Sequence, residues 1–472
     1  MGNSPSSLQQ CIDAVGNGRP NFAGYPTNPL YQFQWVKPYN LDVHVTPAAV
    51  VRPQTAKDIS ALLTCAKTNN VKVQAKSGGH SYANYGLGGE SGALAIDLVN
   101  FQSFRLDNST WHAYIGAGTK LGEVDKKLHP LGRAFAHGVC PDVGIGGHAT
   151  IGGLGPMSRM WGSALDHVVE VEVVTADGKI QRASETENKD LFWGLKGAAA
   201  SLGIITEFVM RTHPEPKDVV QYSYTFAFGS QEDAAPAYVQ WQNLIADPAH
   251  DRRFGTMFIM YPLGAIITGT FYGTKAEFDA TGIASRLPGT SEKTLVVNDW
   301  LGSLAHDAEN EGLYLSNLAT PFYSKSLGFT RSTLIPTSKI PELFRWTDRQ
   351  DKGTLLWFVI FDATGGAVAD PPTNATAFAH RDKVLWYQSY VVGLPLSAKT
   401  KAFVTGFHDQ VLAMAPKGAS GTYAGYVDPA LGERGQMEYW GPNYKMLQGV
   451  KAKWDPADVF HNPQSVRLNP VI

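Results

Sequence analysis

Two side chains with nucleophilic atoms stand in short glycine-containing segments of the sequence. His80 lies in the run SGGHSY at 77–82, and Cys140 lies in the run HGVCP at 137–141. An imidazole nitrogen or a thiolate sulfur can form a covalent bond to an electrophilic carbon. Adjacent glycines expose successive backbone N–H groups, which suit the oxygens of a phosphate. The two segments therefore predict a phosphate-bearing cofactor that is attached to the protein at both residues.

A second glycine-rich segment follows Cys140. It contains Gly144, Gly146 and Gly147 and then the run GGLG at 152–155. This spacing does not match the dinucleotide-binding fingerprint, and no long helix is expected directly after it, so a nicotinamide-binding fold is disfavoured. Loop chemistry alone leaves a second interpretation open, in which these glycines only form turns.

The proximity of His137, Cys140 and His148 in the sequence raises the question of a metal site. Their spacing matches no standard zinc pattern, and no second cysteine or carboxylate cluster completes a set of four ligands. No metal is therefore expected, and the two histidines are predicted to fix the loops by hydrogen bonding.

The chain has three cysteines, and in a secreted protein an odd count leaves one thiol after pairing. Cys65 falls on an expected helix that begins with a capping pattern, and a bridge from it to Cys11 would hold the N-terminal segment in place. The alternative is that both are separate buried thiols. Pairing of Cys11 with Cys65 leaves Cys140, the nucleophile of the second segment.

The elements around these loops alternate between helix and strand. A helix is expected over 56–69 and a strand over 71–75, so that the segment of His80 follows the strand directly. Further strands are expected at 94–98, 111–116, 168–174 and 204–210, with a hairpin turn at 176–179 and a short helix at 190–196. Strands and helices do not alternate regularly, which indicates an α+β fold.

The sequence HPEP at 213–216 marks a boundary, after which the glycine-rich loops stop. Strand candidates follow at 219–227, 254–262, 265–272, 354–361 and 383–392, and helical stretches at 233–246, 340–349 and 397–415 lie between them. We expect one large sheet with helices on one face. The predicted divisions are 1–214, 215–425 and a C-terminal segment 426–472 that begins its last helix at Tyr444.

The bulk composition excludes some classes of partner. The 472 residues are 43% hydrophobic with a formal net charge of −2, and no block of lysine and arginine could follow a nucleic acid backbone or an anionic membrane. The longest apolar run, 355–361, is too short to cross a bilayer. Sequons at Asn108 and Asn374 would accept glycans in a secreted protein, and an extracellular location is predicted.

Several motifs occur together in the sequence: SGGHSY at 77–82, GVCP at 138–141, GGLG at 152–155, TADG at 175–178, NKDLFW at 188–193 and a closing segment 444–465. In this order they resemble the berberine-bridge-enzyme-like branch of the vanillyl-alcohol-oxidase flavoprotein superfamily. Within that branch the sequence most resembles fungal glucooligosaccharide and chitooligosaccharide oxidases. The resemblance implies an FAD-binding domain from 1–214 and 426–472, and a substrate-binding domain from 215–425 built on a large antiparallel sheet.

The resemblance also implies roles for the loop residues. His80 would bond to the 8α-methyl group of the flavin through its imidazole, and Cys140 would bond to flavin C6 through its sulfur. Val143 matches the small residue that leaves oxygen access to the flavin in the family's oxidases. The other residues implied in FAD binding are Ser77, Gly78, Gly79 and Ser81 near the pyrophosphate, Gly144, Gly147 and Gly153 against the cofactor, and Ile205 on the adenine side.

Tyr426 lies in the run YAGYVD at 423–428, which matches the family motif Tyr-x-Asn-Tyr-x-Asp except that Gly425 replaces the asparagine. The resemblance makes Tyr426 the base that takes the proton of the substrate hydroxyl, and it makes Asp362 the acidic partner of that base. Taken alone, Tyr426 is typical of a packed strand tyrosine and Asp362 of a turn residue. Substrate contacts are implied for Tyr82, Gln388 and Tyr423.

The predicted reaction is oxidation of the anomeric C1 hydroxyl of a reducing mono- or oligosaccharide to a lactone, with reduction of O2 to H2O2. The lactone then hydrolyses to an aldonic acid. A monomer is expected, with the sugar and O2 as its partners. Phe358, Ile360 and the segment 256–260 are apolar where relatives place polar sugar contacts, which indicates a broader or different sugar range. Two alternatives stay open: an oxidase of aromatic alcohols or alkaloids, and a flavin-carrying binding or defence protein without turnover.

Overall fold

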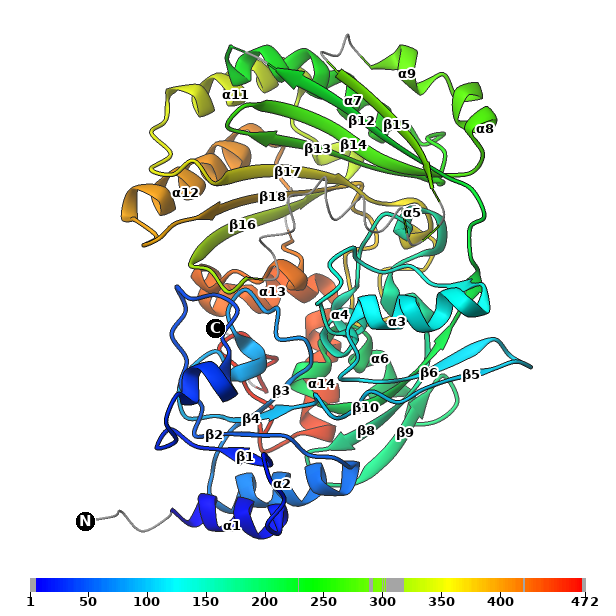
Figure 1. Ribbon diagram of the computed structural model, residues 1–472. Coiled ribbons are helices and arrows are strands. Elements are labelled where there is room, and N and C mark those ends of the chain that lie inside the picture. Colours follow the sequence, from blue (N-terminus) through cyan, green and yellow to red (C-terminus); the bar gives the residue numbers. More distant parts are fainter. Residues whose placement is uncertain are drawn as a thin grey trace.

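The structure of the chain is a computed structural model that describes residues 6–227, 229–287, 292–298, 300, 302, 318–418 and 421–468. These residues form three larger sheets and one two-stranded sheet, with helices packed around them. Figure 1 shows the largest sheet in the upper half of the molecule and the two smaller ones in the lower half. The expected α+β class is confirmed.

The first of the smaller sheets has four strands in the order β1-β2-β4-β3. Its strands are β1 (Ala23–Gly24), β2 (Ala49–Val51), β3 (Val73–Lys76) and β4 (Leu94–Asp97). β4 runs parallel to both β2 and β3, so the connection from β2 to β3 needs a crossover, which helix α2 (Ala56–Thr68) supplies. Thr55 and Asp58 form the predicted capping box at the start of α2. The segment of His80 follows β3 directly, as expected.

A disulfide joins Cys11 in α1 (Ser7–Gly16) to Cys65 in α2, with the two Cα atoms 5.7 Å apart. The predicted pairing is therefore confirmed. Cys140 takes no part in this bridge. The bridge spans 54 residues of chain and holds the first described helix against the crossover helix.

The second of the smaller sheets is five-stranded and antiparallel, in the order β5-β6-β10-β8-β9. Its strands are β5 (Phe104–Asp107), β6 (His112–Gly116), β8 (Val168–Thr175), β9 (Ile180–Ser184) and β10 (Gly203–Arg211). β8 and β9 form the hairpin that the turn sequence predicted. The chain between these strands also forms helices α3 (Leu121–Leu128), α4 (Ile145–Ile151) and α6 (Lys189–Ala198).

Helix α14 (Tyr444–Trp454) packs into the same hydrophobic core as these two sheets, through residues such as Leu447. Its Lys451 is fully buried and donates from Nζ to Asp455 Oδ2 over 2.6 Å and to the carbonyl oxygen of Phe460 over 2.9 Å. Because a buried ammonium group must have partners, these contacts fix the chain that follows the helix. The division of the chain into domains stays a prediction.

The largest sheet has seven antiparallel strands in the order β15-β12-β14-β13-β17-β18-β16. They are β12 (Val219–Ala227), β13 (Phe254–Tyr261), β14 (Gly264–Tyr272), β15 (Glu292–Asn298), β16 (Phe322–Phe329), β17 (Trp357–Ala363) and β18 (Leu385–Val392). Helices α7 (Ala235–Ala246), α11 (Ile340–Arg349) and α12 (Ala398–Met414) cover one face (Figure 1). In the described parts of the chain, every helix is too short or too polar to cross a bilayer.

Strand β17 shows how this sheet separates its two faces. Val359 and Phe361 are buried beneath the helices, and the ring of Phe361 lies edge-on to Tyr238 of α7 with centroids 4.7 Å apart. Ile360 and Asp362 lie on the opposite face and are partly exposed. That second face is left for a functional site.

The structure differs from the expected elements at two places in this sheet. β17 was predicted over 354–361 but runs over Trp357–Ala363, so Asp362 lies within the strand and not in a turn after it. β15 and β16 were not predicted at all. In β16 the lysine and serines of the run FYSKSLGF interrupt the apolar alternation; Ser324 bonds to Gln388 on the neighbouring strand, and Lys325 pairs with Asp428.

Candidate active site

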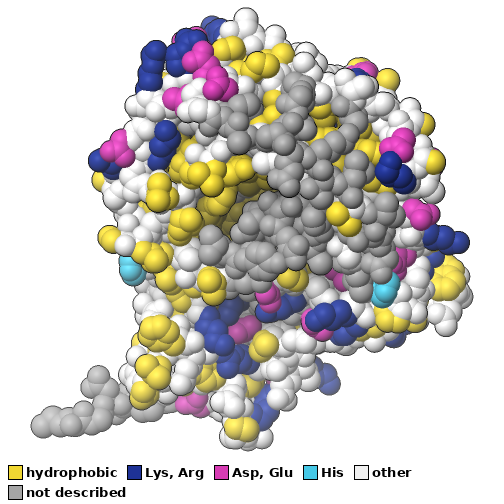
Figure 2. Space-filling model, turned by 45° about the horizontal axis from the view of Figure 1, so that its top comes forward, with side chains coloured by type: hydrophobic (Ala, Val, Ile, Leu, Met, Phe, Trp, Pro, Cys, Tyr) yellow, Lys and Arg dark blue, Asp and Glu magenta, His cyan; other side chains and the backbone are white. Residues whose placement is uncertain are grey.

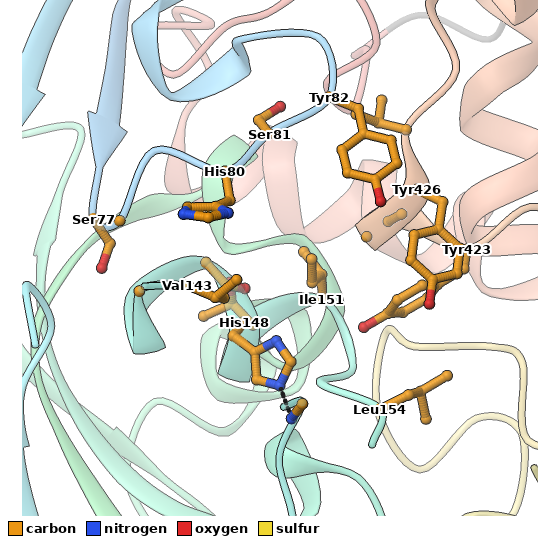
Figure 3. A pocket seen from close by; sticks show the side chains of 18 of the residues that line it. Ser77, His80, Ser81, Tyr82, Val143, His148, Ile151, Leu154, Tyr423 and Tyr426 are labelled. Carbon is orange, nitrogen blue, oxygen red and sulfur yellow. Dashed lines mark hydrogen bonds between the residues drawn. The ribbon is translucent and has the colours of Figure 1, made fainter. Parts of the chain in front are cut away.

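A cavity of about 460 Å³ is lined by the glycine-rich loops and by the open face of the large sheet. Of the sixteen residues predicted to bind cofactor or substrate or to act in catalysis, all but Gly153 line it. They are Ser77, Gly78, Gly79, His80, Ser81, Tyr82, Cys140, Val143, Gly144, Gly147, Ile205, Asp362, Gln388, Tyr423 and Tyr426. Figure 3 shows His80 and Val143 apart from a group of three tyrosines, which comprises Tyr82, Tyr423 and Tyr426.

The two glycine-rich loops pack back to back at Gly78 and Gly144. A Cβ atom on Gly78 would lie 2.3 Å from the backbone nitrogen of Gly144, and one on Gly144 would lie 2.1 Å from the nitrogen of Gly78. Ser77 Oγ donates to the carbonyl oxygen of Ala117 over 2.6 Å and accepts from the N–H of Gly146 over 3.3 Å. The close approach therefore requires glycine at both positions.

The two loops present backbone to the cavity, which fits the phosphate part of FAD. Gly79 has φ +81°, which an L side chain rarely adopts. At Gly147 no atom lies within 4 Å of the position that a Cβ would occupy, so the backbone is open on that side. The open backbone at Gly147 leaves room for the close approach of a cofactor, and the positive φ of Gly79 is also typical of a turn.

His80 leaves the first loop and lies against an aromatic ring. Its ring centroid is 4.5 Å from that of Tyr39, with the planes tilted by 31°. Burial lowers the pKa of His80 to about 4, and the nearby Asp142 carboxylate only partly offsets this effect. The imidazole is therefore neutral near pH 7 and retains a nitrogen lone pair, which a nucleophile needs.

The segment before Cys140 is held by a chain of histidine hydrogen bonds. His137 Nε2 is 2.8 Å from Asp125 Oδ1, and His137 Nδ1 is 2.8 Å from the carbonyl oxygen of Gly138. The N–H of Gly138 donates to His148 Nε2 over 2.9 Å (Figure 3). His148 therefore accepts in this bond and must be unprotonated at Nε2, which agrees with the lowering of its pKa to about 3 by burial.

Both histidines thus fix loops, as predicted, although His148 does so as an acceptor. Among the residues that the structure describes, no group of three or more His, Cys, Asp or Glu side chains could hold a metal ion.

Tyr426 ends a short turn, Ala424–Tyr426, and packs among aromatic rings. Its ring stacks on that of Tyr82 with centroids 5.9 Å apart, and it meets Tyr423 edge-on at 5.1 Å. The hydroxyl oxygen of Tyr423 accepts from the N–H of Gly153 over 2.8 Å. Gly153 is buried outside the cavity lining and holds Tyr423, and its expected contact with the cofactor stays a prediction.

Asp362 faces the cavity from β17. Burial raises the pKa of this carboxyl group from 3.8 to about 7, and the positive charge of Arg159 only partly offsets the effect. Arg159 is itself buried and donates from Nη1 to the carbonyl oxygen of Thr364 over 2.6 Å. Near neutral pH the carboxyl group can therefore both hold and release a proton, as a group in acid–base catalysis must.

Gln388 on β18 is fixed by two hydrogen bonds. Its Nε2 donates to Tyr82 OH over 2.9 Å and lies 3.3 Å from Ser324 Oγ. Because Gln388 and Tyr82 are far apart in the sequence, this bond joins the large sheet to the loop that carries His80.

The motif residue Asp428 anchors the turn of Tyr426 to the large sheet. Its Oδ2 lies 2.6 Å from Nζ of Lys325 on β16, and both side chains are buried. Burial alone would lower the pKa of Lys325, but the Asp428 carboxylate outweighs it, and the net shift is upward. Sequence reasoning did not find Lys325, because its neighbours Ser324 and Ser326 are polar and give no local sign of a buried ion pair.

Comparison with known proteins agrees with this geometry. Residues 47–184 match the family of the FAD binding domain, and residues 422–467 match the family described as berberine and berberine like. The FAD-linked oxidoreductase sorD of Penicillium rubens is 36% identical over 98% of both chains. The carbohydrate oxidase of Microdochium nivale is 33% identical over 98% of this chain and 95% of its own.

Solved structures of flavin-dependent oxidases also resemble this chain in fold. A glucooligosaccharide oxidase from Acremonium strictum with 6-S-cysteinyl, 8α-N1-histidyl FAD superposes with a TM-score of 0.88. It is 29% identical, and the match covers 99% of this chain and 100% of that one. The fold and the site therefore define an FAD-dependent oxidase. The chain belongs to the berberine-bridge-enzyme-like branch of the vanillyl-alcohol-oxidase superfamily, as its motifs indicated.

Proposed function

We propose that the protein oxidises the anomeric C1 hydroxyl of reducing mono- or oligosaccharides to the lactone, which hydrolyses to the aldonic acid, and reduces O2 to H2O2. One observation carries the proposal: Tyr426 and Asp362 line the same cavity as His80 and Cys140. The proposed base, a carboxyl group with a pKa of about 7 and two nucleophilic side chains thus line one cavity. The similarity to carbohydrate oxidases supports a sugar as the substrate.

His80 and Cys140 hold the cofactor in this proposal, through the flavin 8α-methyl group and C6 respectively. The support is the neutral imidazole of His80, the exclusion of Cys140 from the disulfide and the doubly linked FAD of the Acremonium strictum relative. Ser77, Gly78, Gly79, Ser81, Gly144, Gly147 and Ile205 contact the remainder of FAD. Bound FAD supplies the hydride acceptor and returns the electrons to O2. Val143, between Cys140 and the second glycine-rich loop, leaves space for O2 in this proposal.

Tyr426 takes the proton from the substrate hydroxyl. A free tyrosine has a pKa of about 10, so it needs a neighbouring acceptor to work as a base near neutral pH. Asp362 is that acceptor, because its pKa of about 7 lets a large fraction of the carboxyl groups be ionised there. The proton moves from the substrate to Tyr426 and is then held by Asp362.

Gln388, Tyr82 and Tyr423 orient the substrate. The Gln388 amide is held by Tyr82 and Ser324, and Tyr423 is held by Gly153, so each polar group keeps a defined direction. Fixed partners reduce the ordering that substrate binding would otherwise require.

A second candidate is an oxidase of aromatic alcohols or alkaloids. The apolar side chains of Phe358 and Ile360, which line the cavity beside Asp362, favour it. No observation favours a flavin-carrying protein without turnover.

The test is peroxide formation by the purified holoenzyme with glucose, maltose, cellobiose, xylobiose and chitobiose, and with cinnamyl alcohol as the contrasting substrate. We expect peroxide with at least one reducing sugar, together with the aldonic acid detected by mass spectrometry. Tyr426→Phe should keep its FAD absorbance and lose turnover. Peroxide from cinnamyl alcohol and from no sugar would support the second candidate, and the absence of turnover with all of them would contradict both.

We also propose a secreted glycoprotein monomer with an FAD-binding domain from 1–214 and 426–472 and a substrate domain from 215–425. The disulfide supports passage through an oxidising compartment. Asn108 and Asn374 are both exposed, as glycan acceptors must be. A mass shift on glycosidase treatment and light scattering after gel filtration check the glycans and the monomer.

A further inference from the structure

The open face of the large sheet is polar at one end of the cavity and apolar at the other. In β17 the residues on this face are Phe358, Ile360 and Asp362. The pairing with β18 places Ile360 opposite Gln388 and Phe358 opposite Tyr390. Side chains of directly opposite residues in an antiparallel pair are neighbours. The sheet therefore changes from polar to apolar within two residue pairs.

The polar end holds the groups that act on the substrate hydroxyl. Asp362 lies there, and the next pair contains Gln388, whose amide is bonded to Tyr82. Tyr82 in turn stacks on Tyr426. The oxidised carbon must lie at this end, because its hydroxyl has to reach the base.

The apolar end consists of four cavity-lining side chains, which we call the apolar wall: Phe358, Ile360, Tyr390 and Val392. Tyr390 is held in place by its neighbours, since its ring stacks on Phe322 with centroids 4.8 Å apart and an angle of 22°. Its hydroxyl group is bonded to Thr320, so the wall presents the ring rather than the oxygen. Figure 2 shows hydrophobic side chains gathered beside a hollow on one face of the molecule.

Charge also separates the two ends. Among the described residues that line the cavity, the side chains of Asp, Glu, Lys and Arg are those of Lys76 and Asp362. Lys76 is paired with Asp97 at 3.5 Å, away from the large sheet. The apolar wall therefore offers no counter-charge to a substrate, and an ionised group placed against it would lose water without compensation.

Sugar hydroxyl groups that contact the wall would lose hydrogen bonds to water and gain none, whereas an apolar substituent would gain from the removal of its surface from water. We propose that the substrate carries a neutral apolar substituent, an aromatic ring or an acyl chain, which packs on Phe358, Ile360, Tyr390 and Val392 while its hydroxyl group faces Tyr426. This rests on the proposed function for the position of the oxidised hydroxyl. The wall thus determines specificity for the part of the substrate remote from the reacting carbon.

Matched substrates test the proposal with the holoenzyme. Glucose, 6-O-benzoylglucose and 6-O-octanoylglucose all have a free C1 hydroxyl group, and glucuronic acid adds a charge instead of an apolar group. We expect kcat/KM for the benzoyl or octanoyl ester to exceed that for glucose by about tenfold or more, since small apolar groups discriminate on this scale. Glucuronic acid should be the poorest substrate. The two esters distinguish an aromatic ring from an acyl chain.

Binding without turnover gives an independent readout. The 6-O-benzoyl derivative of 1,5-anhydroglucitol lacks the C1 hydroxyl group, so calorimetry measures its affinity alone. Phe358→Gln and Ile360→Gln should each remove most of the preference for this compound over 1,5-anhydroglucitol. Leu355→Gln is the control, because Leu355 is 84% exposed at the outer end of the same segment and does not line the cavity. The control should keep the preference, and FAD absorbance and thermal unfolding verify that all variants are folded.

The outcomes separate the two proposals. If the esters bind and react no better than the unmodified sugars, the apolar wall is not a substrate site, while the carbohydrate oxidase proposal stands. If no sugar or ester reacts but cinnamyl alcohol does, and the wall variants lower its kcat/KM, the carbohydrate proposal is wrong and the role of the wall stands. If the benzoyl analogue does not bind and neither sugars, esters nor cinnamyl alcohol react, both are overturned.

Discussion

Lys325 on the large sheet and Asp428 in the turn of Tyr426 form a buried ion pair with 2.6 Å between Nζ and Oδ2. The pair joins the strand next to Gln388 to the segment that carries the proposed base. Asp428 Oδ1 also accepts from the N–H of Ala430 over 2.9 Å. The carboxylate therefore binds the large sheet through one oxygen and the chain after the turn through the other. We therefore infer that Lys325 helps to position Tyr426.

Replacement of Lys325 tests this role. Lys325→Met leaves the Asp428 carboxylate buried without a counter-charge, which should lower the free energy of unfolding by about 3–5 kcal/mol. Because Tyr426 then loses its fixed position, kcat should fall more than KM changes. Chemical denaturation and steady-state kinetics measure the two effects.

The double variant Lys325→Met with Asp428→Asn provides the control, because it removes both charges. It should recover most of the lost stability but not kcat, since the neutral side chains no longer hold the turn as tightly. If the double variant is no more stable than Lys325→Met, the unpaired charge is not the cause of the loss.

Removal of the disulfide should cost stability without changing the active site. Cys11 and Cys65 close a loop with a sequence separation of 54 residues, and neither residue lines the cavity. Cys11→Ser with Cys65→Ser should lower the free energy of unfolding by about 2–5 kcal/mol. At 25 °C, kcat of the folded variant should match the wild type. A comparable loss of kcat in folded protein would contradict the assignment of a purely structural role.

Much of the fold around the cofactor could be predicted because its signals are local. The capping pattern at Thr55, the turn between β8 and β9 and the glycines of the first loop each act within a few residues. Family motifs added Tyr426 and Asp362, which the residues alone could not assign. The structure brings these sequence-distant side chains into one cavity.

The features that could not be predicted depend on contacts between distant segments. The sequence of β16 lacks a regular apolar alternation, because Lys325 and Ser324 are satisfied by Asp428 and Gln388, which lie far away in the chain. The bond from the N–H of Gly153 to the hydroxyl oxygen of Tyr423, which lies 270 residues away in the chain, is also not indicated by the motif. Sequence periodicity carries no information on such pairs.

The proposed double attachment of FAD predicts a distinctive result after denaturation. Wild-type protein precipitated with acid should remain yellow, and mass spectrometry should find flavin on the peptide with His80 and on the peptide with Cys140. Cys140→Ala should keep the His80 bond and lose part of the turnover, because one tether still holds the cofactor while its reduction potential falls. His80→Ala with Cys140→Ala should give a colourless precipitate. Flavin on only one wild-type peptide would show that the attachment is single.

Asp362 predicts the pH dependence of turnover. Burial raises its pKa from 3.8 to about 7. In the proposed mechanism the carboxylate form is the one that accepts the proton from Tyr426. The value of kcat/KM should therefore rise as the pH rises through about 7 and level off at higher pH. Asp362→Asn should lower kcat by about 10²–10⁴-fold and remove this limb of the profile. An unchanged limb in the variant would assign the titration to another group.

The raised pKa of Asp362 also determines how the stability of the folded protein changes with pH. A carboxyl group whose pKa is higher in the folded than in the unfolded chain binds more protons when folded, so its contribution is most favourable below about pH 4. That contribution is lost as the pH rises from about 4 to about 7, the interval between the two pKa values. The asparagine of the Asp362→Asn variant cannot ionise, so the stability of the variant does not contain this pH-dependent loss. The Tm of the variant minus that of the wild type should therefore be larger at pH 8 than at pH 4, and an equal difference at both pH values would show that Asp362 is not desolvated in the folded protein.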